Sequence, residues 1–106
     1  MKKKLETDNF IRDLYSIIAQ RAKSGKKDSY TKILLKAGPK RIAQKIGEES
    51  SELIIDYLKV SKKRIVEEAA DLIYHIVLLL FSKKITINNI ENELKRRRKI
   101  INVRPK

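Results

Sequence analysis

The chain has 106 residues, a formal net charge of +13 and no cysteine. Its length predicts a single domain over residues 1–106 with a limited core. The lack of cysteine excludes disulfides and thiolate metal sites. With one histidine, an ordinary zinc site is not expected, so any metal here would be a hard cation held by carboxylates.

The positive charge is concentrated at the two ends of the chain. Residues 2–4 are all lysine, residues 95–106 hold basic side chains and no acid, and the segment between them is nearly balanced. Such a basic C-terminal tail, from about residue 95 to 106, is either a solvated arm or a surface that attracts a polyanion. We favour the solvated arm.

No segment typical of a signal peptide or a membrane span is present in the sequence. No apolar stretch of the required kind follows the basic start of the chain. The most apolar run, residues 72–81, is about half the length of a membrane-spanning helix. We therefore expect a soluble, cytoplasmic protein with no membrane partner.

Helical spacing of apolar residues dominates the sequence and predicts an all-α fold. A first helix is expected from about residue 8 to 23, with Thr7 or Asp8 as its cap. A short helix around residues 33–35 follows, capped by Asp28 or Ser29. Residues 38–39, Gly-Pro, end this helix and begin the next one.

Three longer helices complete the expected bundle. They span about residues 39–58, then 62–81 with Ser61 as the cap, and a last helix that begins near Thr86 and enters the basic tail. The inward face of the 39–58 helix is predicted to carry Ile42, Ile46, Leu53 and Tyr57.

The second half of the 62–81 helix has almost no polar face. Residues 72–81 are apolar apart from Tyr74 and His75, and a helix that is apolar all round must be buried all round. One small chain has too few helices to surround it, so we predict a homo-oligomer, most simply a two-fold dimer. A central helix in a monomeric bundle is the alternative.

Seven of the 13 acidic residues fall between positions 48 and 71. They are Glu48, Glu49, Glu52, Asp56, Glu67, Glu68 and Asp71. Helical spacing places Glu49 in line with Ile42 and Ile46, and Glu68 in line with Leu72. Glu52 and Asp71 each follow three residues later and so lie beside these two acids. Each of the two helices thus directs an acidic pair toward the core.

Four converging carboxylates repel one another and need a counter-charge. Oxygen ligands of this kind suit Mg²⁺, which also keeps substrate phosphates as ligands. The alternative is a set of ordinary salt bridges with Lys45 and Arg64. We favour salt bridges for the acids that lie off the inner phase, and a metal for Glu49, Glu52, Glu68 and Asp71.

Three segments carry a resemblance to a known family: SYTKILLKAG at 29–38, IAQKIGEE at 42–49 and EEAADLIYH at 67–75. The paired acidic motif resembles that of the MazG-like all-α NTP pyrophosphohydrolases, and the surrounding residues resemble the phosphoribosyl-ATP pyrophosphatases of histidine biosynthesis. The resemblance covers about residues 8–98. It implies a four- to five-helix bundle completed by oligomerisation. It also implies Mg²⁺ bound by Glu49, Glu52, Glu68 and Asp71, and hydrolysis of 1-(5-phosphoribosyl)-ATP to the AMP derivative and pyrophosphate.

Further roles follow from residue type and position. One carboxylate would orient the attacking water as a base, and Glu52 and Glu49 are the candidates. Candidate phosphate contacts are Lys36, Arg41 and Lys45, and also Ser29, Tyr30 and Thr31 at a helix start with free N–H groups. Solvated charges and simple capping are the alternatives for these two groups. For His75 we expect a hydrogen-bonded core histidine with no catalytic role.

Two other functions are alternatives. A broader housecleaning NTP pyrophosphohydrolase would use the same four carboxylates, but segment 29–38 and the Tyr74-His75 pair argue against it. A basic helical nucleic-acid-binding protein would use the 95–106 tail, yet it leaves the inward acids unexplained. No stacking aromatic residues or nucleic-acid motif support it, so we expect no nucleic-acid partner.

Overall fold

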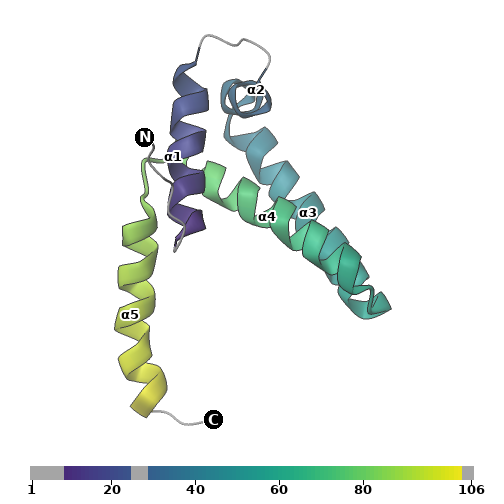
Figure 1. The fold of residues 1–106 in the computed structure, drawn as a ribbon, viewed down its shortest axis with the longest axis vertical. Coiled ribbons are helices and arrows are strands. Elements are labelled where there is room, and N and C mark those ends of the chain that lie inside the picture. The colour runs from purple at the N-terminus through teal and green to yellow at the C-terminus, as the bar shows by residue number, and fades with distance from the viewer. Residues whose placement is uncertain (1–8, 25–28, 104–106) are drawn as a thin grey trace.

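The computed structural model describes residues 9–24 and 29–103, with side chains described as far as residue 98. These residues form helices and no strand, which confirms the all-α prediction (Figure 1). The helices are α1 (Phe10–Lys23), α2 (Tyr30–Ala37), α3 (Pro39–Lys59), α4 (Lys62–Ser82) and α5 (Ile87–Val103).

Local capping bonds explain where several helices begin. The Ser29 hydroxyl accepts a hydrogen bond from the Lys32 N–H at 3.1 Å, and the Ser61 hydroxyl accepts one from the Arg64 N–H at 3.4 Å. Both caps agree with the sequence prediction. Helix α1 begins at Phe10 after Asn9, whose side chain makes no capping bond. The other predicted caps, at positions 7, 8 and 28, lie outside the described residues.

The junction between α2 and α3 is a sharp turn at Gly38. Its φ of +97° lies in a region that glycine adopts without steric cost. The Gly38 N–H closes α2 by donating to the Leu34 carbonyl at 3.1 Å, and Pro39 occupies the first position of α3. The short α2 is therefore held across the start of α3.

Helices α3 and α4 lie side by side and form the longest contact of the molecule (Figure 1). A tight turn with Val60 in the left-handed conformation reverses the chain between them. Only α4 accompanies the far end of α3, so Tyr57 is 68% exposed. The prediction that Tyr57 faces inward is wrong, because none of the other described helices covers that end of the hairpin (Figure 1).

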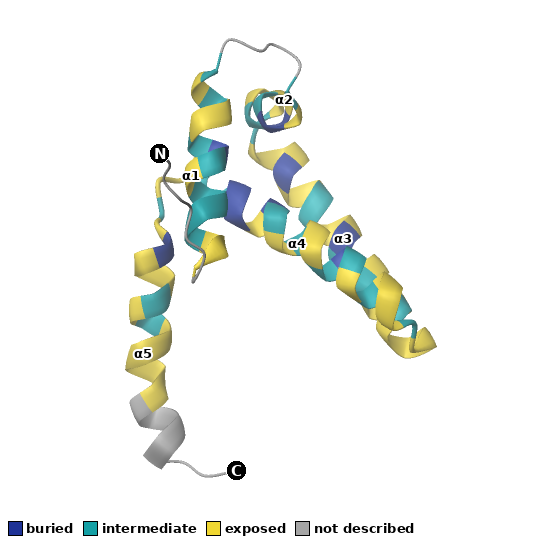
Figure 2. Ribbon diagram, in the orientation of Figure 1, coloured by how far each residue is buried: buried dark blue, intermediate teal, exposed yellow. Residues whose placement is uncertain are grey.

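The core lies where α1, α2, α3 and α4 meet (Figure 2). Its buried members are Ile18, Leu34, Ile42, Val77 and Leu78. Helix α5 leaves this core and touches mainly α1, and an ion pair joins the two helices (Figure 1). Residues 95–98, the first part of the basic tail, are exposed on α5.

The apolar second half of α4 is only partly covered by its own chain. Val77 and Leu78 are buried, whereas Ile73 and Ile76 keep 42% and 39% of their surface exposed. No helix in the described ranges is long and apolar enough to cross a membrane.

Candidate metal centre

Three carboxylates from two helices converge at the middle of the α3–α4 pair. Glu49 from α3 and Glu68 and Asp71 from α4 each place one oxygen within 4.8 Å of the others. Glu49 and Glu68 are buried, with 8% and 5% of their surface exposed, and Asp71 lies at the exposed edge. Helical spacing produces this arrangement, because Glu49 follows buried Ile42 by two turns on the same face.

Glu52 joins the group through Glu68. The pKa of the Glu52 carboxyl is raised above its ordinary value, first because it lies within hydrogen-bonding reach of Glu68 and second because the two charges repel. The Glu52 side chain itself is exposed. The structure thus brings together all four carboxylates that the sequence pattern singled out, two of them buried and two at the rim.

Two cations partly compensate this negative charge. Arg64 donates to Glu68 at 2.8 Å, and the Lys45 ammonium lies 3.6 Å from Glu49. Within the described residues, the four carboxylates form no other ion pair. The salt-bridge alternative is therefore partly realised, with two cations against four carboxylates.

One oxygen on each buried carboxylate has no partner. Oε1 of Glu49 and Oε1 of Glu68 are both inaccessible to solvent and accept no hydrogen bond. A buried charge without compensation is costly. A hard divalent cation binds such oxygens, so the donor set fits Mg²⁺.

The acids outside this group form ion pairs with nearby cations, as the sequence pattern predicted, although the Asp56 side chain is only 13% exposed. Glu48 lies 3.8 Å from Lys45, and Asp56 lies 3.6 Å from Arg64. Glu67 pairs with Arg64 at 3.0 Å and also with Lys63. None of these three contributes to the converging oxygens of the described residues.

The first turn of α2 is tied to α4 just beyond Asp71. The Tyr30 hydroxyl lies 2.7 Å from Nε2 of His75, and Thr31 Oγ1 lies 2.5 Å from the Tyr74 hydroxyl. Nδ1 of His75 lies 2.8 Å from the Asp71 carbonyl oxygen. His75 is thus the hydrogen-bonded core histidine that the sequence predicted. Tyr74 was not predicted as part of the site.

Among the candidate phosphate contacts, some lie near the carboxylates and one lies apart. Partial burial raises the pKa of Tyr30, while the positive charges of Lys45 and Arg41 act in the opposite direction, so both cations are within electrostatic reach of its hydroxyl. Lys36 is exposed toward the end of α2 and borders a separate hollow with Ala22.

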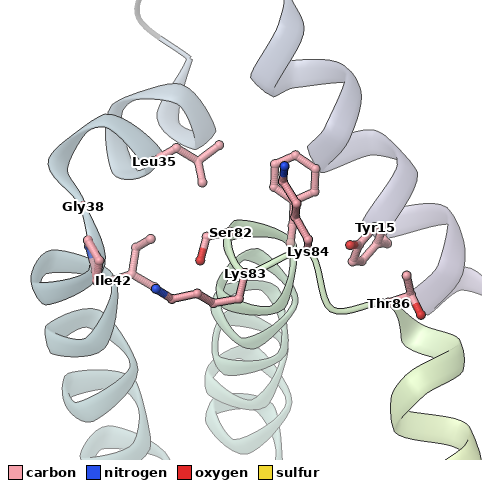
Figure 3. Close-up of a pocket in the computed structure, with 10 residues that line it drawn as sticks. Tyr15, Leu35, Gly38, Ile42, Ser82, Lys83, Lys84 and Thr86 are labelled. Atoms are coloured by element: carbon pink, nitrogen blue, oxygen red, sulfur yellow. The ribbon is translucent and has the colours of Figure 1, made fainter.

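A separate hollow of about 520 Å³ lies where α3 begins and α4 ends (Figure 3). Tyr15, Leu35 and Ile42 line it together with Lys83 and Lys84 at the end of α4. None of the four carboxylates contributes to its wall. Two helical turns, about 10 Å, separate Ile42 from Glu49, so the carboxylate site is distinct from this hollow.

Comparison with known proteins identifies the family. The sequence profile described as phosphoribosyl-ATP pyrophosphohydrolase matches residues 11–98. The chain belongs to this family. The matched range contains the three converging carboxylates, Glu52 and the Tyr30–His75 contact.

Individual members of the phosphoribosyl-ATP pyrophosphohydrolase family align over nearly the whole chain. The chain is 48% identical to the phosphoribosyl-ATP pyrophosphatase of Sulfolobus acidocaldarius over 88% of its length and 98% of that protein. It is 37% identical to the enzyme of the same name from Clostridium novyi, over 95% and 93% of the two chains. It is also 40% identical to the Buchnera aphidicola histidine biosynthesis bifunctional protein HisIE, covering 90% of this chain and 46% of that one.

Tyr74 contributes to the sequence resemblance but was not predicted as a contact residue of the site. Its signal was its position, three residues after Asp71 and next to His75, which places it on the face of α4 that carries the acids. Its partner could not be deduced, because the contact with Thr31 depends on how α2 crosses α4.

Proposed function

We propose that this chain hydrolyses 1-(5-phosphoribosyl)-ATP to 1-(5-phosphoribosyl)-AMP and pyrophosphate, the second step of histidine biosynthesis. We further propose that Mg²⁺ is its cofactor, residues 1–106 are one domain, and the cytoplasm is its location. The observation that supports the chemistry most directly is the convergence of Glu49, Glu68 and Asp71 with two unpartnered buried oxygens. The family assignment supports the substrate.

The four carboxylates Glu49, Glu52, Glu68 and Asp71 would hold the metal. When bound, Mg²⁺ screens the phosphate charges and lowers the pKa of an attacking water. Buried Glu49 and Glu68 would supply the fixed ligands, since their Oε1 atoms have no other partner. Asp71 and Glu52 lie at the exposed edge, from which a phosphate chain can approach.

The protein's own side chains would orient the substrate and the water. Of the two candidate bases, Glu52 is exposed and Glu49 is buried, so we assign the orientation of water to Glu52. Lys45 and Arg41 would contact phosphate oxygens, because both act on the Tyr30 hydroxyl beside the site. The first turn of α2, residues 29–31, would contribute backbone N–H groups at a helix start. Lys36, at the far end of α2, is the weakest of these candidates.

We also propose that the working form is a homodimer. Ile73 and Ile76 on α4, Ile11 on α1 and Leu94 on α5 border an apolar groove of about 310 Å³. A compact domain of this length has a radius of gyration of about 13 Å. The radius of gyration of this chain is 16.1 Å, and α5 and the α3–α4 hairpin project from the core (Figure 1). A second copy would cover the groove and make the assembly compact.

A substrate panel tests the assignment. Phosphoribosyl-ATP, ATP and the other nucleoside triphosphates are compared at equal concentration with excess Mg²⁺, and kcat/KM is measured for each. We expect phosphoribosyl-ATP to exceed every simple triphosphate by at least tenfold. Equal or greater activity on simple triphosphates would contradict the proposal and would favour a housecleaning NTP pyrophosphohydrolase.

A further inference from the structure

We propose that His75 and Tyr74 are positioning residues, which clamp the first turn of α2 at the place where it meets the substrate. This inference rests on the proposed function, because it concerns the same site. In the described chain neither residue contributes to the group of converging carboxylates, and their side chains bond to Tyr30 and Thr31 of α2.

The direction of the hydrogen bonds follows from the Asp71 carbonyl. A carbonyl oxygen only accepts, so Nδ1 of His75 must carry the proton that is donated to it at 2.8 Å. In the neutral ring Nε2 is then an acceptor, and the Tyr30 hydroxyl donates to it at 2.7 Å. His75 is only 5% exposed, so water has little access to its ring. Removing the Tyr30 hydroxyl therefore leaves Nε2 of His75 largely without a hydrogen-bond partner.

A second, parallel bond fixes the rotation of the same turn. Thr31, which is 1% exposed, bonds to the Tyr74 hydroxyl at 2.5 Å. The rings of Tyr30 and Tyr74 stack with centroids 6.0 Å apart, and His75 meets both of them edge-on. Consecutive residues of α2 are thus bonded to consecutive residues of α4.

The clamp matters because it fixes the first turn of α2, whereas buried Leu34 anchors the second turn in the core. A helix of eight residues is not stable by itself, so its position depends on tertiary contacts. Tyr30 is 47% exposed and lies within electrostatic reach of Lys45 and Glu49. A shift of the first turn of α2 would displace this wall of the site and leave the carboxylates of α3 and α4 in place.

The test is a double-mutant cycle with Tyr30→Phe and His75→Phe, read as KM and kcat for phosphoribosyl-ATP at saturating Mg²⁺. Loss of one hydrogen bond that positions substrate is expected to raise KM about fivefold to tenfold. Since ground-state binding is affected and the carboxylates are not, kcat should stay within about twofold. The double variant should match the single variants, because both changes break the same bond.

Tyr15→Phe is the matched control. The Tyr15 ring packs edge-on against Phe81 at 5.8 Å, and its hydroxyl makes no hydrogen bond with the described residues. Its KM and kcat should equal those of the wild type. Tyr30→Phe removes one hydroxyl from a half-exposed ring, so this variant can be measured even if His75→Phe does not fold.

Three outcomes would overturn the clamp. An unchanged KM in Tyr30→Phe contradicts it, as does a fall in kcat at unchanged KM, which would place these residues in the chemistry. Additive effects in the double variant would show that His75 does not act through Tyr30. A wild-type chain that releases no pyrophosphate from phosphoribosyl-ATP overturns the proposed function, and the role of the clamp with it.

Discussion

At the scale of single residues, Glu49 interrupts an apolar stripe on α3. It follows Ile42 and Ile46 on one face and is 8% exposed, with its Oε1 atom unpartnered. Its ion-pair partner Lys45 lies at 3.6 Å, a distance longer than a hydrogen bond. Without metal, the charge of Glu49 therefore repels those of Glu68 and Asp71 and lowers the stability of the fold. Residues needed for function commonly lower stability in this way.

Glu49→Gln should separate stability from activity. The amide keeps the size of the side chain and removes one charge, so the metal-free fold should be as stable as the wild type or more stable, by up to about 1 kcal/mol. Turnover should fall by more than the roughly 10- to 100-fold that outer-shell partners of a metal produce, because an amide is a poor ligand for Mg²⁺. Thermal melting in EDTA and kcat at saturating Mg²⁺ measure the two effects.

Glu48→Gln is the control, since Glu48 also pairs with Lys45 but is exposed and outside the converging group. It should change neither turnover nor melting appreciably. A Glu49→Gln protein that melts well below wild type yet keeps near-normal turnover would show that the acids form a structural salt-bridge network.

The face of the helix on which each acid lies was predictable from the sequence, because it depends only on the spacing of residues within that helix. Glu49 and Glu68 meet as predicted, and so do the ion pairs of Glu48, Asp56 and Glu67. The contact between Thr31 and Tyr74 was not predictable, because its two residues lie on helices whose crossing is set by tertiary packing. The spacing of apolar residues indicates which face of a helix is buried, but not which other helix covers that face.

At the scale of elements, α5 is stabilised by local charges. Arg96 and Arg97 both donate to the Glu93 carboxylate, and their hydrogen bonds lower the pKa of Glu93 to about 2. Because the pKa of Glu93 is lower in the folded chain than its ordinary value of about 4.5, the ionised carboxyl stabilises the fold at pH values above 4.5. This stabilisation is lost as the pH falls toward 2.

Glu93→Gln should therefore lower the melting temperature of the protein at pH 7. Glutamine keeps the length of the side chain but loses the charge that holds the two arginines. The difference from wild type should shrink below about pH 4.5, where the carboxyl of the unfolded chain protonates. Thermal melts across pH 3 to 7 measure it. A difference that stays constant over this range would contradict the role of the charge.

Helix boundaries were largely predictable because their signals are short-range. Ser29 and Ser61 act as the expected caps, and Gly38-Pro39 separates α2 from α3. Thr86 also behaves as predicted, since its hydroxyl accepts from the Asn89 N–H at 3.1 Å. Tyr57 was misassigned because the end of α3 extends beyond the helices that form the core.

At the scale of the whole molecule, part of the apolar face of α4 is left uncovered by the described chain. The run of residues 72–81 predicted that one chain could not cover this helix, and Ile73 and Ile76 are indeed exposed beside the groove. Which of the apolar residues remain uncovered could not be read from the sequence, because it depends on where α1 and α5 pack.

Ile76→Lys should disrupt the proposed dimer. A charge placed in the groove would have to be buried at the interface without a partner, which is strongly unfavourable. Light scattering at micromolar concentration should give a dimer mass for wild type and a monomer mass for the variant. Ile33→Lys on α2, which is 49% exposed and does not border the groove, should remain dimeric. A monomeric wild type would refute the assembly.

The proposed active site requires metal-dependent cleavage that releases pyrophosphate. The most direct measurement is phosphorus NMR of phosphoribosyl-ATP incubated with the purified protein, in the presence of Mg²⁺ or of EDTA. Pyrophosphate and phosphoribosyl-AMP should appear together with Mg²⁺, and neither should appear with EDTA. Release of orthophosphate alone, or unchanged turnover in EDTA, would contradict the assignment of the four carboxylates as the active site.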